Sequence, residues 1–189
     1  KRSDIVERVA AALSAAGLPA RCLELEITEG ALLDHGEGLD RRLAELKALG
    51  VRLAIDDFGT GYSSLAYLSQ LPIDKLKIDK SFVRKLTEDD TSREIVRTIV
   101  GLAHNLGIVA LAEGVETAAQ LDLLQAMGCE YVQGYYFSRP VPNRDIPLML
   151  GADTTAVDRA PQASAEIPAV PVEIAGGPAE ARGCQSASL

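Results

Sequence analysis

Five polar side chains recur at intervals that place each of them near the end of a different predicted strand. They are Glu26, Asp56, Lys77, Glu113 and Gln133, and successive members lie 20 to 36 residues apart. Each interval has the length of one strand plus one helix, so the five groups could converge at one end of an α/β fold. A single acid at the end of a strand often caps a helix or faces water, but the same pattern on five consecutive strands favours a shared site.

The types of these residues restrict the chemistry of such a site. The chain has only two histidines, His35 and His104, and its three cysteines are widely separated without a CxxC pair. This composition argues against a zinc site and against a Ser-His-Asp triad. Carboxylates instead suit hard divalent cations such as Mg²⁺ or Mn²⁺. Asp56 and Asp57 could serve two neighbouring metals, as in two-metal phosphoryl transfer, and Lys77 would orient a water or contact the phosphate.

Other candidate residues carry weaker signals. Asp56 and Asp57 could instead form a turn-capping pair, but the loop Phe58-Gly59-Thr60-Gly61 that follows is typical of an active site. This loop matches neither a P-loop nor a dinucleotide fingerprint, because the later glycines and the lysine are missing. His104 is expected at a helix C-terminus, where it complements the helix dipole.

Charge and hydropathy exclude several classes of protein. The net charge of −8, from 27 acidic and 19 basic residues, argues against a DNA or RNA polymer as partner. No stretch approaches the roughly 18 consecutive apolar residues of a membrane span, and the N-terminus shows no signal-peptide pattern. We therefore expect a cytoplasmic location. The chain enters a helical pattern at once without a starting methionine, so we expect it to be part of a longer parent, whose upstream region could still provide a membrane anchor.

The composition changes near Leu150. Residues 151–189 are rich in Ala, Pro, Gly and Ser and show no sustained period, which predicts a disordered tail. The globular domain is therefore expected to cover residues 1–150.

Strand and helix patterns alternate through this domain. The predicted helices cover residues 4–16, 38–49, 63–70, 92–106 and 118–127. The predicted strands cover residues 22–28, 51–58, 75–79, 108–115 and 131–137. Alternation with short connections indicates a parallel α/β sheet or barrel.

The faces of the predicted strands differ in polarity. In the first strand Leu25 and Ile27 share one face, whereas Glu24, Glu26 and Thr28 share the other, and the next two strands repeat this pattern. An open doubly wound sheet would be apolar on both faces. A polar inner face favours a TIM-barrel-like fold, of which about 150 residues would supply about five of the eight strands.

Five segments closely resemble motifs of the EAL-domain cyclic-di-GMP phosphodiesterases, and the resemblance covers roughly residues 1–145. The segments are Glu24-Leu25-Glu26-Ile27-Thr28-Glu29, Asp56-Asp57-Phe58-Gly59-Thr60-Gly61-Tyr62-Ser63-Ser64-Leu65, Leu76-Lys77-Ile78-Asp79-Lys80-Ser81-Phe82, Ala112-Glu113-Gly114-Val115-Glu116-Thr117 and Gln133-Gly134-Tyr135-Tyr136-Phe137-Ser138-Arg139-Pro140. The resemblance implies a modified TIM barrel that opens cyclic di-GMP to linear pGpG with two Mg²⁺ or Mn²⁺ ions. It also implies a homodimer through this domain and a sensor or cyclase domain upstream.

The resemblance also implies roles for individual residues. Glu26, Asp56 and Glu113 would be metal ligands, and Asp57 would chiefly bind the second metal. Lys77 would hold or polarise the attacking water, and Glu113 would complete the metal shell.

The remaining implied roles lie around this centre. Gln133 would contact the water and metals, and Glu29 would brace the loop that follows Asp57 without touching metal. Glu116 and Asp79 would support the site from behind. The residues implied to contact substrate are Thr60, Gly61 and Arg139.

Two family motifs have no counterpart in the chain. The Glu-Ala-Leu of the first strand, whose Glu is a metal ligand, is absent, and so is an Asn ligand on a following strand. We therefore expect the first three strands to be missing and the 189 residues alone not to hydrolyse cyclic di-GMP efficiently.

Three functional interpretations stay open. The parent could be an active phosphodiesterase, or a catalytically inactive EAL-type module that binds cyclic di-GMP or another protein. A barrel enzyme of another type, with Lys77 as a Schiff-base or proton-abstracting lysine, is disfavoured by the acids around it.

Overall fold

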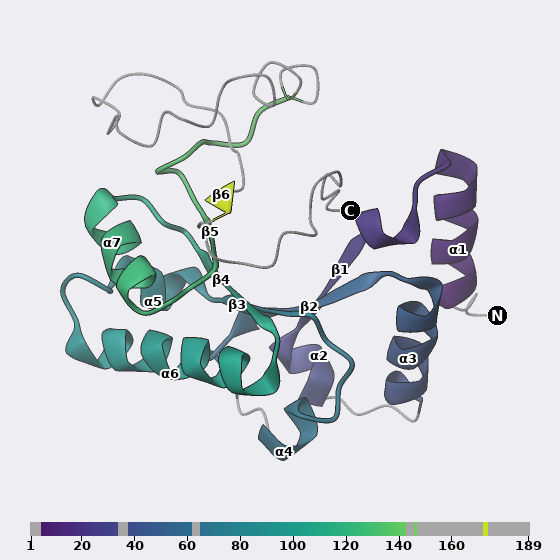
Figure 1. Ribbon diagram of the computed structural model, residues 1–189, viewed down its shortest axis with the longest axis horizontal. Helices are drawn as coiled ribbons and strands as arrows, with labels where there is room; N and C mark the ends of the chain where they lie inside the picture. Colours follow the sequence, from purple (N-terminus) through teal and green to yellow (C-terminus); the bar gives the residue numbers. More distant parts are fainter. Residues whose placement is uncertain (1–4, 34–37, 62–64, 143–145, 147–171, 174–189) are drawn as a thin grey trace. The chain divides into compact units, whose positions relative to one another are not determined.

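The computed structural model describes residues 5–33, 38–61, 65–142, 146 and 172–173 (Figure 1). The chain divides into two compact units with a boundary between Leu76 and Lys77. The first unit contains Lys1–Leu76, and the second contains Lys77–Gly177.

The first unit alternates helices and strands as the sequence predicts. Its elements are α1 (Ile5–Ala16), the 3₁₀ turn η1 (Ala20–Cys22), β1 (Glu24–Thr28), α2 (Glu29–Leu33), α3 (Leu39–Leu49), β2 (Arg52–Phe58), α4 (Leu65–Leu68) and the start of β3 (Lys75–Ile78). Its strands follow the order β1-β2-β3.

Helices α1 and α3 pack side by side in this unit (Figure 1). Each buries one stripe, with Val9 and Leu13 on α1 and Leu43 and Leu46 on α3, as the helical period requires. Gly50 ends α3 in the left-handed region at φ 91° and donates its N–H to carbonyls of the last turn, which is a glycine C-cap. The chain then enters β2 directly.

Strands β1 and β2 pair in parallel, and their register aligns the polar face of each. Glu26 lies opposite Ala54 and Thr28 lies opposite Asp56. Because side chains alternate along a strand, Glu26 and Asp56 share one face, while buried Leu53 and Ile55 lie on the other. The register therefore brings the carboxyl ends of both strands to the same edge.

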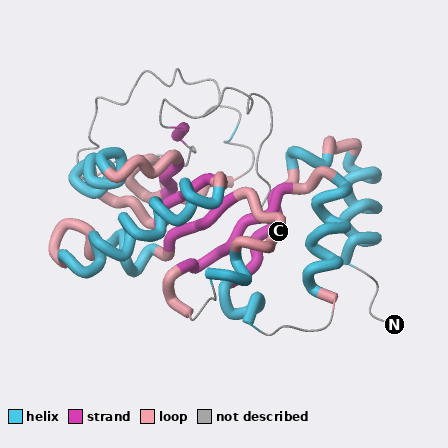
Figure 2. Tube along the Cα trace, turned by 60° about the horizontal axis from the view of Figure 1, so that its bottom comes forward, coloured by secondary structure: helices cyan, strands magenta, loops and turns pink. Residues whose placement is uncertain are grey.

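The second unit continues the alternation from the end of β3. Its further elements are α5 (Lys80–Arg84), α6 (Asp90–Leu106), β4 (Val109–Glu113), α7 (Ala118–Ala126), β5 (Tyr131–Gln133) and β6 (Val172–Glu173). The strand order is β3-β4-β5-β6, with β5 parallel to β4 and β6 antiparallel to β5. Figure 2 distinguishes the strands from the helices that connect them.

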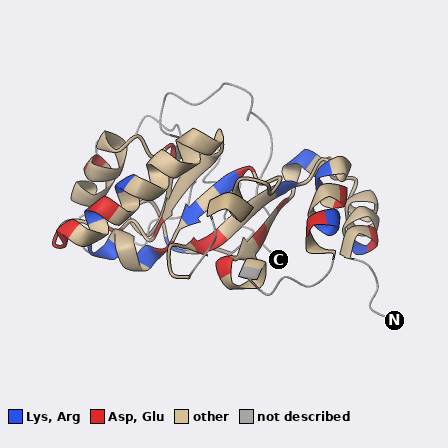
Figure 3. Cartoon of the chain, turned by 90° about the horizontal axis from the view of Figure 1, so that it is seen from below, with Lys and Arg blue, Asp and Glu red and all other residues tan. Residues whose placement is uncertain are grey.

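Helix α6 is the longest described helix of the second unit and packs against α5 and β4. It buries Val96, Ile99, Val100 and Ala103 at helical spacing. Its N-terminus is capped by Asp89, whose carboxylate accepts the N–H groups of the first turn. Figure 3 shows acidic and basic residues together on the helices of each unit.

The predicted α/β class is confirmed, and each of the five predicted strands is longer than the observed one, most of all the last. Residues 134–137 do not continue β5, because Gly134 presses against the backbone of Val115 and a Cβ at Gly134 would lie 2.1 Å from the Val115 carbonyl oxygen. The N–H of Tyr136 then bonds this carbonyl, so the chain turns. At the other end, Cys22 belongs to η1 and not to β1. The short helices α2 and α5 were not predicted.

The predicted tail, residues 151–189, lies outside the described residues except for Val172–Glu173, which form β6. Residues 62–64 of the predicted loop and helix also lie outside them. Among the described helices, none is long and apolar enough to cross a membrane.

Candidate functional site

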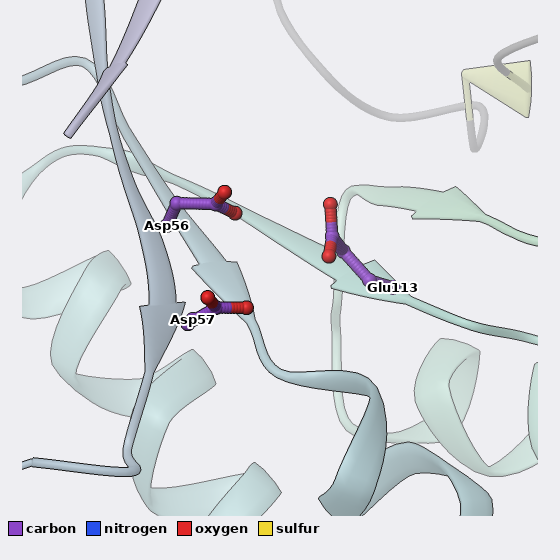
Figure 4. Close-up of side chains that lie close together, drawn as sticks. All are labelled: Asp56, Asp57 and Glu113. Carbon is purple, nitrogen blue, oxygen red and sulfur yellow. The ribbon is translucent and has the colours of Figure 1, made fainter. Parts of the chain in front are cut away.

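An acidic pair, Asp56 and Asp57, lies near the end of β2. Carboxylate oxygens of the two residues lie within 4.8 Å of each other. Adjacent residues of a regular strand face opposite sides, but Asp57 has a left-handed backbone with φ 54°. Asp tolerates this conformation better than most residues. In Figure 4 both carboxylates accordingly project toward the same side of the strand end, which is the arrangement a shared cation would use.

The loop after the acidic pair is held by Glu29, the first residue of α2. The Glu29 side chain is buried, and its Oε2 accepts hydrogen bonds from the N–H groups of Gly59 and Gly61, both at 3.0 Å. A Cβ on Gly61 would lie 2.9 Å from Glu29 Cδ, so a larger residue there would force the Glu29 carboxylate or the loop to shift. Thr60 Oγ1 donates to the Asp57 carbonyl at 2.9 Å. The loop is therefore attached both to α2 and to the acidic pair.

Glu26 lies on the polar face of β1, two residues before Thr28, which is the register partner of Asp56. Glu26 is exposed and Asp56 is half-buried. Since two strand residues span about 7 Å, Glu26 lies about that far along the face from the level of Asp56.

The second unit has a lysine–carboxylate pair near the ends of its strands. Lys77 Nζ lies 2.8 Å from Glu113 Oε1, and the two side chains are 6% and 20% exposed. Glu113 is the last residue of β4 and stands at that strand end in Figure 4. Opposite charges at this distance attract strongly where little water screens them. Lys77 is therefore anchored on the polar face by its ion pair with Glu113.

Gln133 continues this face onto the neighbouring strand. It ends β5, is exposed, and lies opposite Glu113 in the parallel register. Its carbonyl accepts the N–H of Val115 at 3.1 Å. The register therefore places the Gln133 amide beside the Glu113 carboxylate.

Glu116 and Asp79 contact helix termini. The backbone N–H groups of Glu116 and Thr117 both donate to Gln120 Oε1, at 2.7 and 3.0 Å, while Thr117 Oγ1 accepts the Gln120 N–H. This is a capping box at the start of α7. Glu116 also lies 3.6 Å from Arg84. Asp79 is the N-cap of α5 and accepts the N–H of Ser81 at 2.9 Å.

The capping box was missed in the sequence, although its signal was present. Thr117 and Gln120 have the Thr-x-x-Gln spacing that precedes an apolar helix. It fixes the connection from β4 to α7, which carries Glu116.

Arg139 stacks on an exposed tyrosine. Its guanidinium carbon lies 5.3 Å from the centre of the Tyr135 ring, and Tyr135 is 54% exposed. A cation over an aromatic face is attracted by the ring quadrupole. Arg139 is thereby held near the end of β5.

The predicted site residues thus fall into two groups. In the first unit Asp56 and Asp57 lie together, Glu26 shares their face, and Glu29 holds the loop that contains Thr60 and Gly61. In the second unit Lys77 pairs with Glu113, and Gln133 is the register partner of Glu113, whereas Asp79, Glu116 and Arg139 lie on the connecting segments.

The donor set of the first unit fits a hard divalent cation. Asp56 and Asp57 offer only carboxylate oxygens, the ligands that Mg²⁺ and Mn²⁺ prefer. Two carboxylates at this separation repel, and a cation between or beside them relieves the repulsion. The site would therefore gain from binding such an ion.

Comparisons with known proteins agree on one family. A family model described as the EAL domain matches residues 1–140. The cyclic di-GMP phosphodiesterase NbdA of Pseudomonas aeruginosa is 50% identical over 141 residues, which are 75% of this chain and 18% of NbdA. This chain spans about a fifth of the length of the curated relatives it matches.

Solved structures give the same result. The phosphodiesterase PaMucR in complex with c-di-GMP matches with a TM-score of 0.74 and 41% identity, over 77% of this chain and 59% of that chain. Klebsiella pneumoniae BlrP1, in a complex with manganese and cyclic di-GMP, matches with a TM-score of 0.68 and 38% identity, over 73% of this chain and 35% of that chain.

Proposed function

Because the chain belongs to the EAL domain family, we propose that the protein that contains it is a signalling phosphodiesterase that hydrolyses cyclic di-GMP to linear pGpG. The observation that carries this proposal is the acidic pair Asp56 and Asp57, whose oxygens lie within 4.8 Å of each other at the end of β2. The relatives NbdA and PaMucR are phosphodiesterases by name. The acidic pair gives this chain the donor chemistry that such a reaction needs.

The proposed metal ligands are Glu26, Asp56, Asp57 and Glu113, and the ions would be Mg²⁺ or Mn²⁺ in a two-metal site. When bound, these ions would supply positive charge that offsets the charge of the phosphodiester during displacement. The backbone of Asp57 turns its carboxylate toward the side of Asp56, which supports a role for both as ligands. Glu26 and Glu113 would add oxygens from strands β1 and β4.

Lys77, Glu113 and Gln133 would act on the attacking water. Lys77 Nζ lies 2.8 Å from Glu113 Oε1. Its ammonium would hold the water oxygen through a donated hydrogen bond and would face the anionic phosphate. Gln133, in register with Glu113, would offer an amide donor or acceptor to the same water. These groups orient the nucleophile, and such positioning is a large part of phosphoryl-transfer catalysis.

The loop with Thr60 and Gly61 and the stacked Arg139 would contact the substrate. Glu29 holds the loop by accepting two of its backbone N–H groups. The Tyr135 ring holds the Arg139 guanidinium. Asp79 and Glu116 would keep the connections behind Lys77 and Glu113 in place. We further propose that the protein is cytoplasmic and dimerises through this domain, with a sensor or cyclase domain upstream.

The test is a product assay on the natural protein that contains residues 1–189. With Mn²⁺ present, chromatography should show conversion of cyclic di-GMP to pGpG, and chelation should stop it. Asp56→Asn should lower turnover at least a hundredfold, whereas Asp122→Asn, an exposed acid of α7, should leave it within twofold. Binding of cyclic di-GMP without any turnover, or turnover unchanged in Asp56→Asn, would overturn the proposal.

A further inference from the structure

The outer edge of β5 carries a short strand from a distant part of the chain. Strand β6 pairs antiparallel with β5, so that Val172 lies opposite Val132 and Glu173 lies opposite Tyr131 (Figure 1). Both strands belong to the second unit. In the described sheet the order is β1-β2-β3-β4-β5-β6, so β5 would be an edge strand without β6. The composition of residues 151–189 predicts no ordered structure, so this pairing needs an explanation.

The backbone of Val132 explains why β5 needs a partner on this edge. The Gln133 carbonyl points to the β4 side of the strand, because it accepts the N–H of Val115 at 3.1 Å. In an extended strand the N–H and C=O groups of successive residues point to opposite edges, so those of Val132 point away from β4. Val132 is only 1% exposed. Its backbone groups are therefore shielded from water, and shielded N–H and C=O groups need partners within the protein.

The sequence around β6 suits a short strand at the edge of a sheet. Val172 and Ile174 have β-branched side chains, which favour an extended backbone. Pro171 comes directly before β6, and proline is compatible with a strand only at its start or at a sheet edge, because it lacks an N–H. Gly176 and Gly177 follow within a few residues and disfavour a longer strand. The local sequence therefore favours a strand that is short and placed at an edge.

We propose that the outer edge of β5 is a docking site for an extended segment, and that the chain's own residues 172–173 occupy it. The docked segment supplies backbone partners to Val132 and covers an edge on which another chain could otherwise pair. An edge holds one strand at a time, so docking of this segment excludes pairing of β5 with a second copy of the chain. The inference does not depend on the proposed function, because it concerns the backbone of β5 and no proposed ligand.

The experiment measures amide hydrogen exchange by NMR in the full chain of 189 residues, at Val132 and at Val100. Val132 reports docking on β5, whereas Val100, buried on α6, reports opening of the whole unit. Val172→Pro removes the N–H of the residue opposite Val132 and so disfavours the pairing. Val157→Pro is the matched control, because it makes the same change elsewhere in residues 151–189 and leaves β6 unaltered.

We expect the Val132 amide to exchange at least tenfold faster in Val172→Pro than in the unaltered chain, while Val100 stays within twofold. Both amides should stay within twofold in Val157→Pro. Protection of Val132 in the unaltered chain should not change on tenfold dilution, because a partner from the same chain does not depend on concentration. Faster exchange at both Val132 and Val100 in Val172→Pro, absent from the control, would also support docking, since an undocked segment would not stabilise the unit.

Three results would overturn the proposal. The first is equal exchange of the Val132 amide in Val172→Pro and in the unaltered chain. The second is an equal acceleration in Val172→Pro and Val157→Pro, which would show that the position of the proline does not matter. The third is protection of Val132 that falls on dilution, which would assign the edge to a second copy of the chain. Each would leave the phosphodiesterase proposal standing, because conversion of cyclic di-GMP tests that proposal separately.

Discussion

The two units differ in the charges that lie close together at the ends of their strands. In the first unit Asp56 and Asp57 bring like charges within 4.8 Å of each other. In the second unit Lys77 and Glu113 form a pair of opposite charges at 2.8 Å, largely shielded from water. Like charges favour the arrival of a cation, whereas the ammonium of an ion pair can still donate a hydrogen bond to a water. We propose that the acidic pair contributes metal ligands and that Lys77 of the second arrangement orients a water.

The two units also differ in how the neighbouring backbone is supported. The loop after the acidic pair is held by a carboxylate, Glu29, which accepts two backbone N–H groups. The connection after Glu113 is held by the side-chain amide of Gln120, which accepts the backbone N–H groups of Glu116 and Thr117. Each unit therefore uses one acceptor side chain to fix the segment that follows its strand end.

The largest expected effect comes from neutralising the acidic pair. Asp56→Asn together with Asp57→Asn should weaken Mn²⁺ binding by a hundredfold or more, because both proposed carboxylate ligands are lost. A thermal melt of the same variant without metal shows whether its fold is intact. Calorimetry and a thermal melt check the two parts, and Asp122→Asn serves as the matched control. Mn²⁺ binding of unaltered strength in the double variant would contradict the contrast between the units.

The second prediction concerns the ion pair of the other unit. Lys77→Met leaves the Glu113 carboxylate without its cation in a mostly buried position, and should lower the free energy of unfolding by about 2 kcal/mol, less than for a fully buried pair because Glu113 is 20% exposed. Adding Glu113→Gln should recover part of this loss. Urea denaturation of the single and double variants gives the coupling between the two residues. A coupling near zero would mean that the pair is not an electrostatic unit.

A smaller effect should follow from closing the space that Glu29 occupies. Gly61→Ala would place a Cβ at 2.9 Å from Glu29 Cδ, so the loop or the buried carboxylate must shift, at a cost of about 1–2 kcal/mol. Gly101→Ala is the matched control, since no atom lies within 4 Å of its Cβ position on α6, and alanine there should stabilise the helix by up to about 1 kcal/mol. Chemical denaturation measures both. Equal effects of the two substitutions would show that Glu29 does not constrain the loop.

The smallest predicted effect is on how the stability of the fold depends on pH, and it arises at Tyr67 of α4. Burial raises the pKa of Tyr67 to about 12 from 10, with a further contribution from the hydrogen bond of its hydroxyl to Asp40 at 2.7 Å. A raised pKa stabilises the folded protein fully below pH 10, and this contribution is lost as the pH rises toward 12. Tyr67→Phe should therefore flatten the decline in stability between pH 10 and pH 12, as measured by urea unfolding at each pH. An identical decline in the variant would refute the assignment.

The elements of the fold follow from local patterns wherever those patterns are strong. The period of α6 predicts a helix over residues 92–106, and the structure has it at residues 90–106, with an Asp89 cap that was not predicted. The end of β5 could not be predicted, because residues 134–137 look like a continuous strand until Gly134 meets the backbone of Val115. That contact joins residues distant in sequence, and no local propensity encodes it.

The candidate site, like the fold, could be predicted from the sequence only in part. The acids and Lys77 were recognisable by type and spacing, because strand ends recur at regular intervals. The left-handed backbone of Asp57 and the ion pair of Lys75 with Glu24 were not, since both depend on the packing of neighbouring strands. Sequence therefore predicts which groups are present at the strand ends more readily than it predicts how they are aimed.

The most direct test of the central claim is anomalous X-ray scattering from crystals of the protein grown with Mn²⁺. Metal binding by the acidic pair predicts a manganese peak at the carboxylates of Asp56 and Asp57, and its loss in crystals of Asp56→Asn. A manganese peak elsewhere with none at this pair, or no manganese peak at all, would contradict it.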